Sequence, residues 1–342
     1  MKRIVLAGFF LILVVLGIGG WTLTSYLDTP LGGDTAVDIN VERGSNLRAV
    51  LGDMAAFEVL KHPKWLYAYA RLTQQTALRA GLYEARSNQS PRQLLAMLLK
   101  GAVKTESFTL AEGLNRWQVR DALVGGHWID AARFDSLCDD AAFLKQHNIP
   151  GPSCDGYLFP ETYTFARGVA SEKLFEAMFA AFLRNYEAVT QAGRGPLDLD
   201  MRRFVTLASI VEKETGAAQE RPRIACVFYN RLRAKPVWRL DTDPTVIYAA
   251  TLEDPNFDGN IKRHHLRNLK NPYNTYTNNG LPPGPISSPG RAALEAVAAP
   301  AECGDFFFVS MNNGKHVFCP DLACHNAAVN TWQIQYFRKK RP

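Results

Sequence analysis

The sequence lacks the cysteine spacing of a redox or zinc-ribbon site, because none of its six cysteines forms a Cys-x-x-Cys pair. His316, Cys319, Cys324 and His325 lie close together, but two nearby cysteines without a second matching pair are weak evidence for zinc. We therefore expect no metal site and no cofactor.

The same cysteines can form disulfides if this part of the chain lies outside the cytoplasm. The candidate pairs are Cys138 with Cys154 and Cys303 with Cys319. Spacing alone does not fix the connectivity.

A large excess of charge of one sign is also missing. The net charge of +6 is modest and spread along 342 residues, which fits an anionic surface or polymer as a partner but gives no reason to expect nucleic acid. The basic run Arg338–Arg341 is typical of a solvated tail. No serine, cysteine or metal constellation stands out, which argues against a peptidase or an amidase.

One long apolar run is present, from Ile4 to about Leu23, directly after Lys2 and Arg3. Its length is close to the roughly 20 residues of a membrane-spanning helix. A cleaved signal peptide is the alternative, but no small-x-small cleavage pattern follows in residues 22–27. We expect an uncleaved anchor over residues 1–27 with its N-terminus in the cytoplasm and the body outside the cytoplasm.

The remaining chain is long enough for more than one core, and 47% of the sequence is hydrophobic. Pro30, Gly32 and Gly33 indicate a linker over residues 28–36. Residues 37–103 then predict a small α+β module with a strand at 37–41, a helix that starts at Gly44-Ser45, a strand at 80–85 and a helix at 91–100. This pattern resembles the LysM-like glycan-binding module, although a structural spacer explains it equally well.

Residues 104–342 predict a larger α+β domain. Asn115 and Ser288 are expected to cap helices, and residues 306–309 and 317–318 are expected to form a hairpin. Its central stretch, Thr206–Thr215, is an apolar helical run that ends in Glu212 and Glu214.

Two positions on a helix are about 200° apart, so the two glutamates point to opposite sides. Glu212 shares its side with Ser209, Ala208 and Val205, small residues that would leave room for a ligand above the carboxyl. An acid in apolar surroundings is a plausible proton donor because burial raises its pKa. A simple amphipathic helix with a solvated last turn is the alternative.

Several segments carry a family resemblance. They are Leu158–Tyr163 (LFPETY), Ala208–Thr215 (ASIVEKET), Val227–Leu232 (VFYNRL), Thr242–Tyr248 (TDPTVIY), and Tyr273–Tyr276 (YNTY) with Gly280–Gly284 (GLPPG). In this order, over nearly the whole chain, they resemble the YceG-like family, the MltG-type endolytic murein transglycosylases. The family commonly has Asp where this chain has Glu161, and Gln or another polar residue where it has Asp241.

The resemblance implies a lyase that cuts the glycan strands of peptidoglycan, with Glu212 as the catalytic acid and base and Glu214 in a structural role. The expected substrate-binding residues are Glu161, Tyr163, Thr242, Asp243, Tyr248, Asn274, Thr275 and Tyr276. One acid suffices because the C6 hydroxyl of N-acetylmuramic acid acts as the nucleophile, which leaves a 1,6-anhydro end and terminates the strand. Further candidate partners are peptidoglycan synthases or division proteins, and a non-catalytic glycan-binding scaffold is the alternative function.

Overall fold

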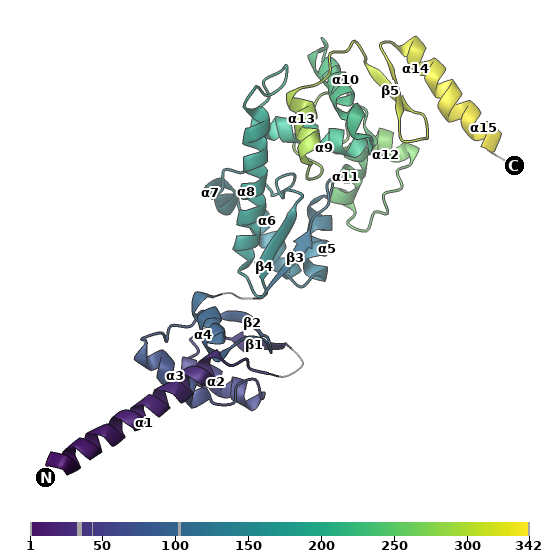
Figure 1. The fold of residues 1–342 in the computed structure, drawn as a ribbon. Helices are drawn as coiled ribbons and strands as arrows, with labels where there is room; N and C mark the ends of the chain where they lie inside the picture. Colours follow the sequence, from purple (N-terminus) through teal and green to yellow (C-terminus); the bar gives the residue numbers. More distant parts are fainter. Residues whose placement is uncertain (1, 33–35, 43, 102–103, 341–342) are drawn as a thin grey trace. The chain divides into compact units, whose positions relative to one another are not determined.

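The computed structural model describes residues 2–32, 36–42, 44–101 and 104–340 (Figure 1). The chain divides into two compact units, unit 1 with residues 1–107 and 164–169, and unit 2 with residues 108–163 and 170–342. Gly33 of the expected linker, Val103 at the expected end of the small module and Arg341 of the basic run lie outside the described residues.

Helix α1 (Lys2–Asp28) belongs to unit 1 and continues beyond the predicted apolar run as far as Asp28. Its segment Gly8–Asp28 is long and apolar enough to cross a membrane. Most large apolar side chains between Phe9 and Trp21 are exposed, whereas Leu27 is buried in the core of unit 1. The first part of this helix thus has no protein partner among the described residues, and its last turn has one.

The rest of unit 1 is a small α+β arrangement of β1 (Val37–Val41), α2 (Leu47–Ala56), α3 (Pro63–Leu72), β2 (Gly81–Ala85) and α4 (Pro91–Lys100). Strands β1 and β2 pair antiparallel, with Val37 opposite Ala85 and Val41 opposite Gly81. The predicted start at Gly44-Ser45 is slightly early, because the side chain of Asn46 caps α2 by accepting from the Ala49 N–H.

The core of unit 1 joins one face of each helix to the inward side chains of the strands. It contains Leu27, Ile39, Val41, Leu47, Val50, Leu51, Met54, Leu60, Leu66, Ala70, Tyr83, Ala85, Leu94, Leu95 and Leu98.

Unit 2 is mostly helical. Strand β3 (Thr105–Thr109) pairs with β4 (Thr162–Ala166), and the boundary between the units falls within both strands. The other elements are α5 (Arg116–Gly125), α6 (Ala131–Cys138), α7 (Ala141–Gln146), α8 (Ser171–Thr190), α9 (Met201–Glu214), η1 (Ala218–Glu220), α10 (Arg221–Arg233), α11 (Asp243–Glu253), α12 (Arg263–Asn268), α13 (Arg291–Ala298), β5 (Phe307–Ser310), β6 (His316–Cys319), α14 (Leu322–Val329), the π-helical turn η2 (Asn330–Gln335) and α15 (Tyr336–Lys340).

Helix α9 is the centre of unit 2, and Figure 1 shows it among α8, α10 and α13. Asp200 caps its start, and every residue from Phe204 to Glu212 is buried. The expected apolar stripe is therefore a helix enclosed on all sides, and a polar side chain on it must be paired inside the protein or face a cavity.

The disulfides agree with the sequence in one case and differ in another. Cys138 is bonded to Cys154 as expected, but Cys303 is bonded to Cys226, and Cys319 to Cys324. The predicted Cys303–Cys319 pair is wrong because Asn230, on the same helix as Cys226, donates to the carbonyls of Cys303 and Asp305 and holds that segment against α10.

Candidate active site

Glu212 is paired inside the protein. Its Oε1 accepts from Arg221 Nη2 at 2.7 Å and its Oε2 accepts from the Gly290 N–H at 3.0 Å. Burial raises the pKa of this carboxyl, while the Gly290 N–H and the Arg221 charge act in the opposite direction. Both oxygens are thus occupied by protein donors.

The small residues beside Glu212 make room for the chain itself. Ser209 Oγ accepts from the Ile286 N–H at 3.1 Å, and the Ser287 hydroxyl donates to the Ser209 carbonyl. Val205 and Ala208 are fully buried. The expectation of an open space for a ligand on this side is therefore wrong, because the segment before α13 fills it.

Glu214 is the last residue of α9 and lies on the opposite side of this helix from Glu212. Its side chain lines a cavity of about 540 Å³, and its Oε1 is buried with no hydrogen-bond partner among the described residues. Burial raises its pKa to about 8, assisted by the negative charge of Asp243 and opposed by Arg231. A pKa of about 8 leaves this carboxyl mostly protonated at neutral pH.

The cavity that contains Glu214 combines charged, aromatic and apolar side chains from five elements and the segments between them. Its lining consists of Glu214, Arg231, Arg239, Asp241, Asp243, Tyr276, Phe307, Phe308, Leu322 and His325. Aromatic faces beside carboxyl and guanidinium groups suit a sugar, whose ring has both apolar faces and hydroxyls.

Asp243 and Tyr276 are the two predicted substrate-binding residues that reach this cavity. The Tyr276 hydroxyl donates to Asp243 Oδ1 at 2.8 Å. Burial and the surrounding carboxyls raise the pKa of Tyr276, so its hydroxyl keeps its proton. The pair presents a fixed carboxylate at the start of α11, in the same cavity as Glu214.

Two arginines in the lining of this cavity, Arg231 and Arg239, are held in place by backbone carbonyls. Arg231 Nε donates to the Phe306 carbonyl at 2.7 Å and Nη1 donates to the Leu240 carbonyl at 2.5 Å. Arg239 Nη1 donates to the Tyr276 carbonyl at 3.0 Å, and its Nε lies 3.5 Å from Asp241 Oδ1. Burial lowers the pKa of Arg231, which remains a cation that faces the acids of the cavity.

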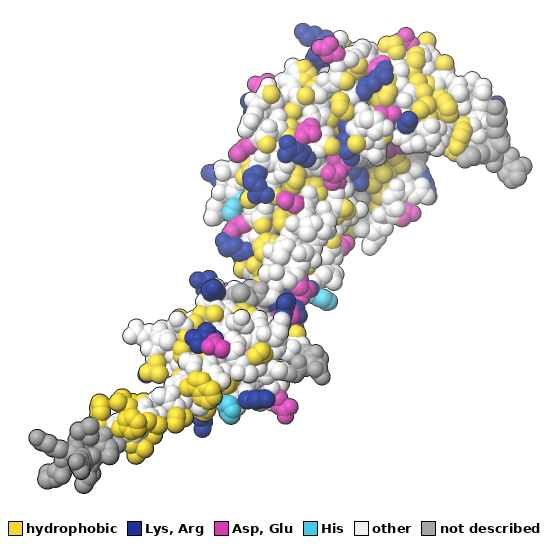
Figure 2. Space-filling model, in the orientation of Figure 1, with side chains coloured by type: hydrophobic (Ala, Val, Ile, Leu, Met, Phe, Trp, Pro, Cys, Tyr) yellow, Lys and Arg dark blue, Asp and Glu magenta, His cyan; other side chains and the backbone are white. Residues whose placement is uncertain are grey.

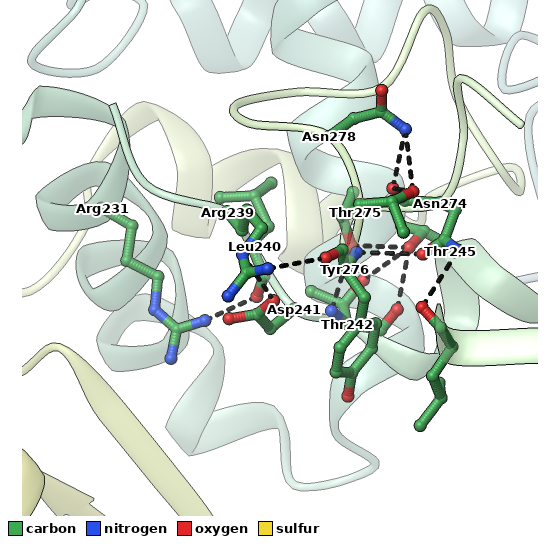
Figure 3. Close-up of polar contacts among 12 residues, drawn as sticks. Arg231, Arg239, Leu240, Asp241, Thr242, Thr245, Asn274, Thr275, Tyr276 and Asn278 are labelled. Carbon is green, nitrogen blue, oxygen red and sulfur yellow. Dashed lines mark hydrogen bonds and ion pairs between the residues drawn. The ribbon is translucent and has the colours of Figure 1, made fainter. Parts of the chain in front are cut away.

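Three other predicted substrate-binding residues, Thr242, Asn274 and Thr275, are buried, and Figure 3 shows their polar contacts. The Thr275 hydroxyl accepts from the Thr242 N–H at 3.1 Å and lies 2.7 Å from Thr245 Oγ1. Asn274 donates to the carbonyls of His265, Leu266 and Leu269 and accepts from the Tyr276 N–H.

These three side chains are 0–2% exposed and bonded within the protein, which favours a structural role, and direct contact with substrate stays a prediction for them. They position the backbone of Asp241–Asp243 and the ring of Tyr276.

Comparison with known proteins identifies the family. The model of the YceG-like family matches residues 39–331. The chain belongs to the YceG-like family. It is 30% identical, over 86% of its length and 84% of the relative, to the endolytic murein transglycosylase of Bacillus subtilis.

Two further relatives agree. The endolytic murein transglycosylase of Streptococcus pneumoniae is 27% identical over 94% of this chain, and the match spans 64% of that longer protein. The crystal structure of a putative yceG-like protein from Listeria monocytogenes has a TM-score of 0.55 and 29% identity, and the match covers 86% of this chain and 99% of that one.

Three other predicted residues of this YceG-like chain are not among those that line the cavity. The Tyr248 hydroxyl donates to Asp155 Oδ2 at 2.5 Å, and burial raises the pKa of Asp155 to about 6. Tyr163 is buried and donates to the Phe159 carbonyl at 2.7 Å. Glu161 is exposed, with Arg184 at 3.7 Å.

The sequence missed several lining residues of this YceG-like site. Arg231 lies within a quoted family motif, and Asp241 was singled out as a departure from the family, so both carried a signal. His325 was considered only for zinc. Its ring packs on Phe307 at 5.0 Å between centroids, and burial and the charge of Arg231 lower its pKa.

A second cavity of about 370 Å³ adjoins the first, since Arg231, Arg239, Asp241 and Phe307 line both. Its own residues include Trp238, which is 40% exposed and contacts the rings of Phe306 and Phe307. The two cavities are thus neighbours within unit 2.

Proposed function

We propose that this chain is an endolytic murein transglycosylase, as its curated relatives are named, and that Glu214 is its acid. The observation that carries the proposal is the unpaired carboxyl of Glu214 in a cavity lined by aromatic, anionic and cationic side chains. Its pKa of about 8 keeps it protonated at neutral pH, which general acid catalysis requires.

In this mechanism Glu214 donates its proton to the glycosidic oxygen that leaves N-acetylmuramic acid. The resulting carboxylate then takes the proton of the C6 hydroxyl of N-acetylmuramic acid, as the C6 oxygen attacks C1 of the same sugar. The bond from C1 to the leaving sugar breaks, a 1,6-anhydro ring forms, and Glu214 regains its proton. In this proposal the carboxylate of Asp243, held by Tyr276, stabilises the positive charge that develops at C1, and the Arg231 cation binds acidic groups of the substrate.

The choice of Glu212, made from the sequence, stays a prediction, but its contacts favour a structural role. It joins Arg221 of α10 to the Gly290 N–H before α13, and a proton on either oxygen of Glu212 would compete with one of these donors. A buried pair of this kind costs about 3–5 kcal/mol when one partner is removed.

Hydrolysis is the second candidate reaction, because Asp243 supplies a second carboxyl in the same cavity. A hydrolase needs such a group to activate water or to attack the sugar, whereas a lytic transglycosylase does not. The product separates the two, since hydrolysis leaves reducing ends.

We also propose that α1 anchors the protein in the inner membrane, with the chain after α1 outside the cytoplasm. The apolar helix supports a span, and three disulfides support an oxidising compartment. The β1–α2–α3–β2 order of unit 1, with paired outer strands, supports a LysM-like module that adds affinity for glycan strands.

The test is mass analysis of the products formed by the purified full chain from glycan strands. We expect anhydro ends, and we expect Glu214→Gln to reduce their formation about 10²- to 10⁴-fold because glutamine does not shuttle a proton.

Glu212→Gln is the matched variant on the same helix. It should lower thermal stability but retain turnover at a temperature where it is folded. A folded, inactive Glu212→Gln together with an active Glu214→Gln would restore Glu212 as the catalyst. Absence of any cleavage by the wild type would favour the glycan-binding scaffold.

A further inference from the structure

The end of α1 is fixed to unit 1, so the height of nearby residues above the membrane follows from the helix. Leu27 is 1% exposed within the core, and Asp28 forms an ion pair with Arg92 of α4 at 2.8 Å. The apolar run of 20 residues from Ile4 to Leu23 measures about 30 Å as a helix, which equals the thickness of the hydrocarbon layer. The outer edge of that layer therefore lies close to Leu23.

A cluster of aromatic side chains lies at this height. Tyr26 packs edge-on against the rings of His62 and Trp65 at 5.5 and 5.6 Å, and its hydroxyl donates to the His62 carbonyl. Trp65 is 44% exposed and Trp21, on the preceding turns of α1, is 72% exposed. Tryptophan and tyrosine concentrate at this level of membrane proteins because their rings are apolar and their polar edges reach water.

The cluster surrounds a cavity of about 330 Å³. It is lined by Trp21, Thr22, Ser25, Tyr26, Thr29, Pro30, Leu31, Lys61, His62, Trp65 and Pro91. No acidic residue is in this lining, and neither Lys61 nor the adjacent Lys64 forms an ion pair among the described residues. The cavity thus offers apolar walls, hydroxyls and an unpaired cation at the height of lipid headgroups, and Figure 2 shows apolar side chains exposed on the neighbouring α1.

We propose that this cavity binds an anionic phospholipid, with the phosphate at Lys61 and the upper acyl chains against Trp21 and Trp65. The bound lipid would seat unit 1 on the outer surface of the membrane. The proposal rests on α1 spanning the membrane and is independent of the cleavage chemistry.

The experiment places the full chain in nanodiscs that contain phosphatidylglycerol brominated close to the headgroup, since bromine quenches nearby tryptophan. The emission of Trp65 is the difference between the wild type and Trp65→Phe, which keeps an aromatic ring at this position. We expect the brominated lipid to quench most of this emission. The corresponding difference for Trp128, which is 8% exposed and lies in unit 2, should not change.

Lys61→Gln tests the headgroup. The concentration of brominated phosphatidylglycerol that gives half-maximal quenching should rise about fivefold. One basic side chain contributes about that factor to binding at an anionic surface. Equal quenching of Trp65 by brominated phosphatidylcholine would overturn the preference for an anionic lipid. Quenching of Trp21 without Trp65 would overturn the cavity as a lipid site and leave the anchor intact, and neither result depends on the activity of the enzyme.

Discussion

At the scale of single residues, Glu212 and Glu214 have opposite environments although they are two positions apart on α9. Glu212 meets an arginine and a backbone N–H, which satisfy its charge. Glu214 meets a cavity and the charge of Asp243, which disfavour its ionised form. The helix period places the two groups on opposite sides, but the neighbouring elements decide which side is filled.

The raised pKa of Glu214 makes stability depend on pH. An unfolded glutamate has a pKa of about 4.3, and the folded value is about 8. Between these values the folded state holds a proton that the unfolded state has lost, so stability falls as the pH rises, by up to about 1.4 kcal/mol per pH unit from this group.

Glu214→Gln removes this loss. We expect the free energy of unfolding of the variant, measured in urea, to exceed that of the wild type increasingly from about pH 4 to about pH 8 and by a constant amount above. A difference that does not change with pH would contradict a raised pKa for Glu214. Cleavage by the wild type should fall above about pH 8 as the acid loses its proton.

Trp238 belongs to the same scale, as the exposed ring of the adjoining cavity. If it stacks on a sugar, Trp238→Ala should raise KM for glycan strands about two- to tenfold, since an aromatic contact contributes about 0.5–1.5 kcal/mol. Trp238→Phe should retain most of the affinity. An unchanged KM for Trp238→Ala would show that the glycan strand does not contact the cavity that Trp238 lines.

At the scale of elements, the contact between the loop before α13 and α9 depends on a glycine. Gly156 has a φ of +84°, and an added Cβ would lie 2.4 Å from Pro285 and 3.2 Å from Val205 of α9. Gly156→Ala should therefore destabilise the protein by more than the about 1–2 kcal/mol of the left-handed conformation alone. Thermal unfolding measures this, with Gly168→Ala, which has a φ of +74° but open space around it, as the control.

Local signals predicted elements well where capping and alternation decide the structure. β1 spans the residues expected from alternation, Asn115 forms the predicted cap, and α4 spans the predicted residues 91–100. Ser288 does not cap a helix, because its N–H and C=O pair with Leu114 and Gly113, and α13 begins at Arg291. α3 was missed, since its two fully buried residues, Leu66 and Ala70, give a narrow apolar stripe.

The site was predictable only in part, for the same reason. Family motifs located α9, α11 and the segment around Tyr276, but the inward direction of Thr242 and Thr275 depends on contacts between segments about 30 residues apart. Phe307 and His325 join the cavity from the C-terminal part of the chain. No local pattern encodes that approach.

At the scale of the whole molecule, the small module should contribute binding without chemistry. Removal of residues 37–103 from the full chain should weaken binding to long glycan strands in a pull-down assay while leaving measurable formation of anhydro ends, because Glu214 and its cavity lie in unit 2. Unchanged affinity for long strands would reduce the module to a spacer. Loss of cleavage in a folded product would show that it assists the reaction.

The burial of Leu27 also determines whether the part of the protein after α1 could be released from the membrane. A protease that nicks the chain between Thr29 and Gly32 cuts the covalent connection, but Leu27 still lies in the core and Asp28 still pairs with Arg92. Release would have to pull Leu23, Tyr26 and Leu27 out of unit 1 and open its apolar interior to water. The nicked protein would thus stay on the membrane, and a released one would carry an unfolded module that other proteases remove.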